Sequence, residues 1–312
     1  MKTQTLTHLF AAVAACSLAA CGGGDSGISP TSATTPAPAA TTTPSSPAPA
    51  PAPATPTPAP TSPAPSPAPA ATPSAPAPAS STSASGDCNY EGNIFSVAGN
   101  SAQMDNNIYA SDGITVLISQ QNKYQVKSDG SFRGETGLME LSTDNTSTYT
   151  SAAANGSLAG MTVGPTNVKS YSKLSGANVL TSGLVTTTTV LGFSFAATSY
   201  MTPPISWPAA PTLNTPYTST YTVTTEATAT TPGSTSTQTV TTTFLGVEQV
   251  SVAAGTFAAC KTKTETVAGT SAATVSYSWS VASGRLKGHS LKSEDASGKK
   301  TMEAKVLLLN GN

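Results

Sequence analysis

The stretch "ATVSYSWSVA", residues 273–282, alternates bulky side chains with small polar ones. Val275, Tyr277, Trp279 and Val281 occupy every second position, and Thr or Ser lies between them. Successive side chains of an extended strand point to opposite faces, so this period of two predicts a β-strand. Its aromatic and β-branched residues suit a pleated surface. We therefore predict a strand with one packed, aromatic face and one polar face.

The same alternation recurs near the C-terminus in residues 299–309, and more weakly in residues 217–230. Turn-forming pairs such as Ser283-Gly284 and Ser297-Gly298 separate the alternating runs, which is typical of hairpins. Strands joined in this way form an antiparallel meander. We predict its strands at 217–230, 237–252, 256–267, 273–282, 285–293 and 299–309.

Turn signals also divide the chain upstream. Asp112-Gly113 and Asp129-Gly130 bracket a predicted pair of strands, and Asn155-Gly156 predicts a hairpin turn. Residues 184–216 contain several prolines, which cannot donate to a central ladder. We expect a strand to about Ala197 and then an ordered loop over one end of the sheet. Residues 87–312 are thus predicted to form a single all-β domain, an antiparallel meander folded as a strongly curved sheet, an open barrel or a sandwich.

Four aromatic residues allow two interpretations. They could be ordinary core and lid packing, or they could form the wall of a ligand groove. The groove hypothesis names Phe193, Trp207, Tyr277 and Trp279.

The N-terminus predicts export. A basic Lys2 precedes the apolar run "LFAAVAACSLAA", residues 9–20, which is shorter than the roughly 20 residues that span a bilayer. We interpret residues 1–20 as a signal peptide. Leu18-Ala19-Ala20-Cys21 resembles the lipobox of bacterial lipoproteins, which implies that Cys21 becomes the acylated N-terminus. Gly22, which follows it, implies sorting to the outer membrane. The alternatives are the register ending at Cys16, or an ordinary signal with an incidental cysteine.

Residues 30–86 contain Pro, Ala, Ser and Thr, with neither charged nor aromatic side chains. Such a segment has too little to bury to fold, and its prolines favour extended polyproline II. We interpret residues 21–86 as a lipidated N-terminus and a disordered linker, in which residues 30–86 reach at most roughly 175 Å. It would hold the domain on the periplasmic face or at the cell surface. An O-glycosylated stalk has the same composition.

Two cysteines remain, Cys88 and Cys260. In an oxidising compartment they predict one disulfide, which closes a loop of about 170 residues. Free thiols or a redox site are the alternatives, but the chain has no Cys-x-x-Cys sequence.

Residues 246–290 resemble a pattern in β-rich domains of bacterial lipoproteins and periplasmic proteins of unknown function, roughly G-x-E-x-V-x-V-P-A-G-T-F followed by a Tyr/Trp-rich strand. This sequence has Ala253 at the proline position, and Arg285 interrupts the closing motif. The resemblance implies a fold and carries no catalytic residues. The matching positions are Gly246, Glu248, Val250, Val252, Ala254, Gly255, Thr256, Phe257, Trp279, Gly284, Leu286 and Lys287.

Charge and histidine content argue against several classes of function. The chain has 14 basic and 15 acidic residues without a basic stripe, so we expect no nucleic-acid partner. After removal of His8 the only histidine is His289, which we expect to be solvated. We expect no metal, no cofactor and no catalytic residue, because no hydrolase or phosphate-binding motif occurs.

Three functions remain open. The first is a lipid-anchored binding or structural module for an envelope protein, glycan or peptidoglycan. The second is a carrier of lipid or another hydrophobic ligand in the periplasm. The third is an uncharacterised envelope hydrolase.

Overall fold

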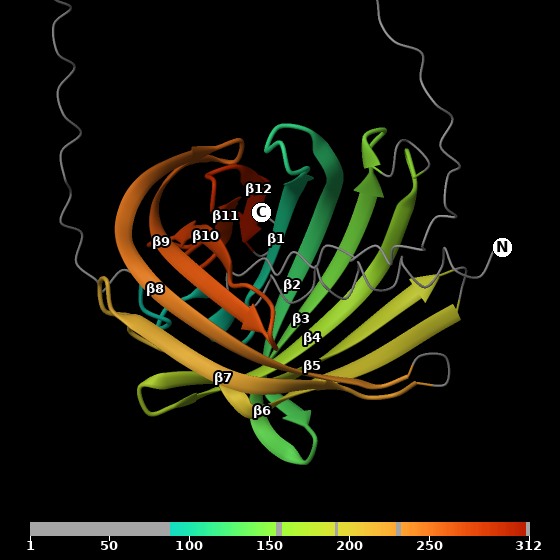
Figure 1. Cartoon of the computed structure of the whole chain (residues 1–312), viewed down its shortest axis with the longest axis vertical. Coiled ribbons are helices and arrows are strands. Elements are labelled where there is room, and N and C mark those ends of the chain that lie inside the picture. Colours follow the sequence, from blue (N-terminus) through green and yellow to red (C-terminus); the bar gives the residue numbers. More distant parts are fainter. Residues whose placement is uncertain (1–87, 154–157, 191–192, 229–231, 310–312) are drawn as a thin grey trace, which may run out of the picture. The chain divides into compact units, whose positions relative to one another are not determined.

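The computed structural model describes residues 88–153, 158–190, 193–228 and 232–309 (Figure 1). The signal peptide, Cys21, the linker and Asn155-Gly156 lie outside these residues. A short 3₁₀ helix, η3 (Ile94–Ser96), precedes the strands. The strands are β1 (Ser101–Tyr109), β2 (Val116–Phe132), β3 (Glu135–Tyr149), β4 (Thr162–Ser175), β5 (Asn178–Val190), β6 (Phe193–Pro208), β7 (Pro216–Thr225), β8 (Ser234–Val252), β9 (Gly255–Ala268), β10 (Thr274–Val281), β11 (Ser290–Asp295) and β12 (Lys300–Leu309).

The twelve strands form one antiparallel sheet in which each strand pairs with its neighbours in sequence. The predicted all-β meander is therefore confirmed. The sheet also closes, because β1 pairs with β12 from Ala102 opposite Leu309 to Ile108 opposite Met302. Closure removes both edges of the sheet, which would otherwise expose unpaired backbone groups.

The predicted strands of the C-terminal third overlap β7 to β10 and β12, although β7 ends at Thr225. The prediction for 285–293 is wrong at its start, because β11 begins only at Ser290. Gly284 and Gly288 have φ values of 81° and 90°, which turn the chain out of the strand conformation. The Gly288 N–H donates to the Val281 carbonyl at 2.8 Å and closes this loop.

The predicted pair of strands upstream is also wrong. The residues between Asp112-Gly113 and Asp129-Gly130 belong to a single strand, β2, and Gly130 lies at a bulge within it. The turn comes later, at Arg133 and Gly134, where φ is 51° and 85°. Bulges accept glycine as readily as turns do, so the pair Asp-Gly did not distinguish them.

The proline-rich segment after Ala197 is strand rather than loop. β6 continues through Pro203 and Pro204 to Pro208. Its register with β5 jumps from Tyr200 to Ile205, and its pairing with β7 stops at Thr202. Both prolines thus lie in an irregularity where no ladder N–H is needed, which is how a sheet tolerates them.

Burial identifies the face that lines the barrel. In β2, Asn122, Tyr124 and Val126 are buried, whereas Lys123 and Gln125 between them are exposed. Asn122 and Tyr124 lie opposite the buried Met104 and Ala102 of β1. We call this the inward face, and cross-strand pairing extends it around all twelve strands.

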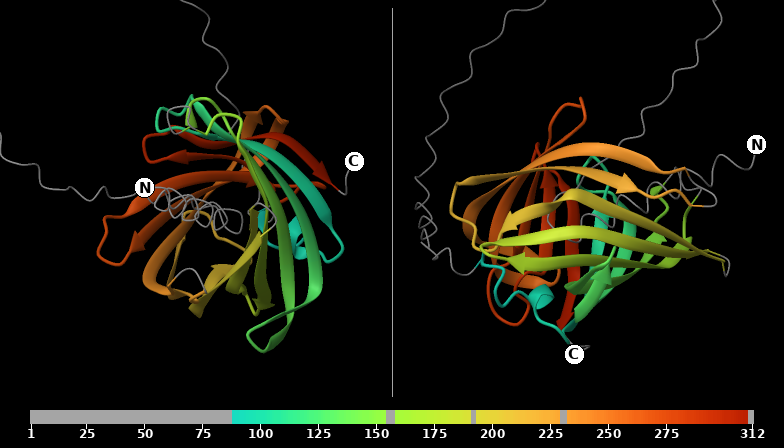
Figure 2. Two further views of the ribbon diagram at one scale, coloured as in Figure 1. Left: turned by 90° about the vertical axis from the view of Figure 1, so that its right-hand side faces the viewer. Right: turned by 90° about the horizontal axis from the view of Figure 1, so that it is seen from below.

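The segment from Cys88 to Asn100 closes one end of the barrel. Ile94 and Phe95 pack against Met104, Tyr124 and other inward residues. Figure 2 (left) shows this cyan segment within the ring of strands. The Ile94 N–H donates to the Lys287 carbonyl at 2.9 Å, which joins the segment to the loop between β10 and β11.

Candidate binding sites on the barrel

Five inward side chains of β1, β2 and β3 form a closed ring of hydrogen bonds, which we call the amide ring. Asn106 donates to Gln120 at 3.2 Å, Gln120 to Ser147 at 3.2 Å and Ser147 to Asn145 at 2.9 Å. Asn145 donates to Asn122 at 2.7 Å, and Asn122 returns the chain to Asn106 at 2.8 Å. Each member gives one hydrogen bond and receives one, so each amide group keeps a second N–H for another acceptor.

The ring is buried at one side and open at the other. Asn106 and Asn122 are 2% and 7% exposed, while Gln120, Asn145 and Ser147 are half-buried. The sequence carried a signal for the ring, because polar residues occupy alternate positions in each strand. The pairing of three strands that brings these positions together was not visible in it.

Hydroxyl groups line another part of the barrel, on β9 to β11, which β12 separates from β1. Thr264 of β9 pairs with Ser276 of β10, and Thr262 pairs with Ser278. Ser278 in turn lies opposite Ser293 of β11. Thr262, Ser278 and Ser293 point inward and are nevertheless half-buried rather than buried. At the mouth, Phe195 of β6 shares the inward face with Thr188 and is 40% exposed.

Charged side chains are segregated from this lining. Among the inward positions of the described strands, the one charged residue is Asp295, at the end of β11. Its carboxylate accepts from the N–H groups of Ser297 and Lys299 at 2.8 and 3.0 Å, so it caps its own turn. The Ser297 hydroxyl also donates to this carboxylate, at 2.7 Å, and is the main cause of a lowered pKa for Asp295, followed by the Lys299 N–H.

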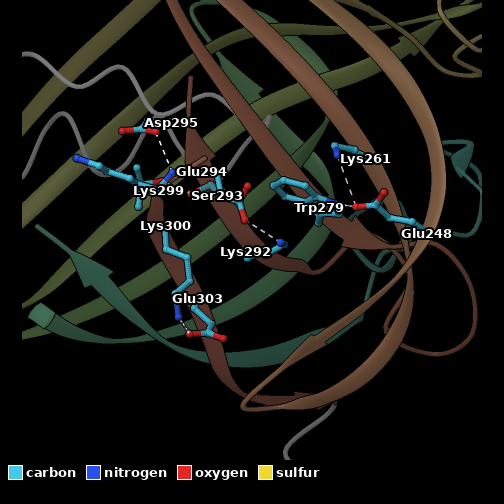
Figure 3. A network of polar contacts seen from close by, with 11 residues as sticks. Glu248, Lys261, Trp279, Lys292, Ser293, Glu294, Asp295, Lys299, Lys300 and Glu303 are labelled. Atoms are coloured by element: carbon cyan, nitrogen blue, oxygen red, sulfur yellow. Dashed lines mark hydrogen bonds and ion pairs between the residues drawn. The ribbon is translucent and has the colours of Figure 1, made fainter. Parts of the chain in front are cut away.

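The outer face holds a network of ion pairs around Trp279 (Figure 3). The Trp279 indole N–H donates to Glu248 Oε1 at 2.6 Å. The ammonium groups of Lys261 and Lys292 lie 4.9 and 4.0 Å from the centre of the ring. Lys292 also pairs with Glu294 at 2.8 Å. With Trp279 only 2% exposed, the network seals the ring from solvent and leaves no open stacking surface.

One carboxylate of this network, that of Glu303, is held ionised. Burial opposes ionisation of Glu303, but hydrogen bonds from Lys300 and Tyr109 outweigh it and lower the pKa of the carboxyl group. In return, the hydrogen bond to Glu303 is the main cause of a raised pKa for Lys300. A carboxylate fixed in this way is a poor general acid, which needs a raised pKa. The network is better suited to stabilising the wall than to chemistry.

The four predicted groove residues do not come together. Trp207 packs inside the barrel beside Met201, Ile205 and Tyr221. Tyr277 and Trp279 belong to a separate cluster on β8 to β11 with Val250 and Val281. The side chain of Phe193 lies outside the described residues.

His289 is fully buried, so the expectation of a solvated histidine is wrong. Its ring lies 5.3 Å from that of Phe95 and 5.8 Å from that of Tyr124, at the closed end of the barrel. Within the described part of the chain neither ring nitrogen has a hydrogen-bond partner. Burial lowers the pKa of His289 to about 4. The described residues contain no group of three metal-ligating side chains.

The predicted disulfide is present between Cys88 and Cys260, whose Cα atoms lie 5.8 Å apart. It joins the start of the domain to β9 beside the buried Phe244 and Ala282. The disulfide therefore fixes the first of the described residues to β9. No helix within the described residues has the length and apolarity to cross a membrane.

These features define a closed antiparallel barrel whose inward face combines apolar clusters with uncharged polar groups. No known protein family and no curated protein matches the sequence. Two solved structures are similar over most of the barrel. One is a Bacteroides fragilis protein described as exported and as having a YmcC-like fold, at 15% identity and a TM-score of 0.37, over 68% of this chain and 96% of that one. The other is a Parabacteroides distasonis protein described as a lipoprotein, at 14% identity and a TM-score of 0.37, over 69% and 98%.

Proposed function

We propose that this chain is a lipid-anchored, non-catalytic protein of the bacterial outer membrane that binds a ligand inside its barrel. Cys21 carries the acyl chains, and residues 21–86 hold the barrel away from the membrane, on its periplasmic face or at the cell surface. Several acyl chains on one terminus give durable anchoring, whereas one gives marginal binding.

The observation that carries the binding role is the half-exposed polar lining of the barrel. An eight-stranded barrel is about filled by its own side chains, and diameter grows with strand number. A barrel of twelve strands can enclose a wider interior, of which apolar clusters fill a part and Ser, Thr and Asn line another. Buried polar groups are costly unless they are hydrogen-bonded. The second N–H groups of the amide ring are therefore positioned for water or a ligand.

A hydrophobic carrier is the second candidate. The inward cluster of Val168, Leu184, Met201, Ile205, Tyr221 and Val240 favours it, because an apolar group could lie there. The amide ring interrupts the apolar lining beyond this cluster. A long acyl chain would have to desolvate the ring without bonding to it, which is unfavourable.

Native mass spectrometry of the full-length protein, released from detergent in the gas phase, tests both parts of the proposal. We expect a mature chain beginning at Cys21 with its acyl chains, and an additional retained mass. Gln120→Leu, which opens the amide ring, should lose the retained mass. Gln121→Leu is the matched control, since Gln121 is the next residue of β2 and faces outward.

Metabolic labelling with an alkyne fatty acid tests the anchor separately. Label should be present in the wild type and absent from Cys21→Ser. Label that persists in Cys21→Ser would assign the anchor to another residue. An unmodified terminus in the wild type would refute the lipoprotein proposal and leave the binding proposal standing.

A further inference from the structure

We infer that the ligand inside the barrel is an uncharged glycan chain, held by the amide ring and by hydroxyl groups on β9 and β10. This inference rests on the proposed binding function and names the chemical class of the ligand. It follows from three properties of the inward face: its lack of charge, its mixture of donors and acceptors, and an aromatic side chain at its mouth.

The missing charge decides against ionic ligands. A carboxylate or phosphate entering the barrel would lose its hydration, and no inward Lys or Arg among the described strands would compensate it. Of the described lysines, those of the ion-pair network stay on the outer face, where Lys261, Lys292 and Lys300 pair with glutamates. A neutral ligand avoids this penalty.

The mixture of donors and acceptors matches hydroxyl and acetamido groups. An amide side chain offers N–H donors and a carbonyl acceptor on one rigid plane, and a Thr or Ser hydroxyl offers both functions. Sugar hydroxyls likewise donate and accept. The amide ring on β1 to β3 and the hydroxyls of Thr262 and Ser278 would therefore bond to the same chain.

One hydroxyl of the wall supports this reading. Thr242 Oγ1 on β8 is buried and, within the described residues, has no hydrogen-bond partner. Thr242 lies opposite Thr264, in the same row as Ser276. An unpaired buried hydroxyl costs about 1–3 kcal/mol, which a hydroxyl of the ligand could offset.

Phe195 supplies an apolar face at the mouth. Its side chain is 40% exposed although it lies on the inward face, next to the Thr188 position. Sugar rings have one face of C–H groups that packs on aromatic rings, so a chain entering the barrel would pass over Phe195. The closed end, sealed by Ile94 and Phe95, limits the length of chain that can enter.

Calorimetric titration of the full-length protein tests the ligand class. The detergent should contain no sugar, for example lauryldimethylamine oxide. The probes are neutral hexasaccharides of four types, chitohexaose, maltohexaose, cellohexaose and mannohexaose, with hexagalacturonate as the acidic probe and palmitate as the apolar one. We expect at least one neutral hexasaccharide to bind, and neither hexagalacturonate nor palmitate to bind.

Three variants locate the binding site. Gln120→Leu should weaken the neutral probe about ten-fold or more by leaving its ring partners unpaired. Gln121→Leu, on the outer face, should leave the affinity unchanged. Ser278→Leu fills the barrel without removing any hydrogen bond of the amide ring, so it should block binding in a protein of unchanged melting temperature even if Gln120→Leu is unstable.

The outcomes separate this inference from the proposed function. If only palmitate or hexagalacturonate binds, and Ser278→Leu blocks that binding, the ligand is not a neutral glycan. The proposal that the barrel binds a ligand would then still hold. Binding of a neutral probe that neither inward variant affects would overturn the location. If no probe binds and native mass spectrometry shows no retained mass, both the glycan and the binding role are refuted.

Discussion

His289 shows what a single buried titratable residue does to this fold. Its pKa of about 4 lies below the ordinary 6.5, because the ring is buried between Phe95 and Tyr124. His289 therefore stays neutral in the folded protein at a pH where the unfolded protein has already protonated it. Stability is complete above pH 6.5 and is lost as pH falls from 6.5 to 4.

We predict a loss of about 3 kcal/mol from this residue over that range. The measurement is the free energy of unfolding in urea at pH 7, 5.5 and 4.5, for the wild type and for His289→Gln. The difference between the two proteins isolates the histidine, because Asp112 and other carboxylates titrate in both. A difference that does not change with pH would show that His289 is charged or hydrated in the folded barrel.

Trp279 is the second residue whose environment makes a prediction. Glu248, which is itself exposed, accepts the indole N–H of the buried Trp279 at 2.6 Å. Glu248→Ala should cost about 1–3 kcal/mol, because a buried donor is left unpaired, and Glu248→Gln should cost less because an acceptor remains. Thermal melts give the cost. In a Trp207→Phe background, the fluorescence emission of Trp279 should shift to longer wavelength in Glu248→Ala. An unshifted spectrum would contradict the prediction that Glu248 keeps the Trp279 ring from solvent.

At the scale of elements, the hairpin of β2 and β3 continues beyond the barrel wall and folds over the outside of β4 to β6. Phe132 stacks on Tyr171 with ring centres 4.9 Å apart, and Leu138 is fully buried beside them. Arg133 lies over the ring of Tyr200, 3.8 Å from its centre, and pairs with Glu226. Burial, followed by the charge of Glu140, raises the pKa of Tyr171 to about 12.

Gly183 of β5 makes this packing possible, because an added Cβ would lie 2.4 Å from the Phe132 ring. We predict that Gly183→Ala displaces the hairpin and lowers stability by about 1–3 kcal/mol, as overpacking does. Limited proteolysis should then cleave near Arg133 faster than in the wild type. Thr187→Ala, on the same strand and without this contact, is the control. Equal cleavage rates would show that the hairpin docks independently of Gly183.

At the scale of the whole molecule, the disulfide joins residues 172 positions apart and fixes the closing segment to β9. Loss of a native disulfide typically costs about 2–5 kcal/mol. We predict a lower melting temperature for Cys88→Ser/Cys260→Ser, and an equal drop for the wild type in reducing agent. The double variant should not respond to reducing agent. A wild type whose melting temperature resists complete reduction, verified by thiol titration, would contradict the prediction.

In the barrel as a whole, nearly all charged side chains of the described strands lie on the outer face. The sequence predicted this arrangement only in part. The alternation of residues 273–282 correctly predicted β10, and it correctly placed Trp279 and Ser278 on opposite faces. It did not show that the serine face would line the interior, with the aromatic face packed outside under Lys261 and Lys292. A period of two specifies that two faces exist, and closure of the sheet decides which one is inside.

The amide ring shows the same division. Asn106, Gln120, Asn122, Asn145 and Ser147 lie at alternate positions of three strands, so the sequence placed members of each strand on one face. Whether these side chains come within hydrogen-bonding distance depends on the registers of β1 with β2 and of β2 with β3. Register is set by packing and turn geometry over many residues, and a one-residue shift would have pointed the ring outward.

The sequence by itself determined the all-β class, the meander order, most strand positions of the C-terminal third and the pairing of Cys88 with Cys260, because these depend on local alternation, turn residues and a count of two cysteines. Closure of the sheet, the continuation of β6 through its prolines, the burial of His289 and the uncharged lining were decided only by tertiary structure. Each of these depends on contacts between residues far apart in the chain, and local patterns carry no information about such distances.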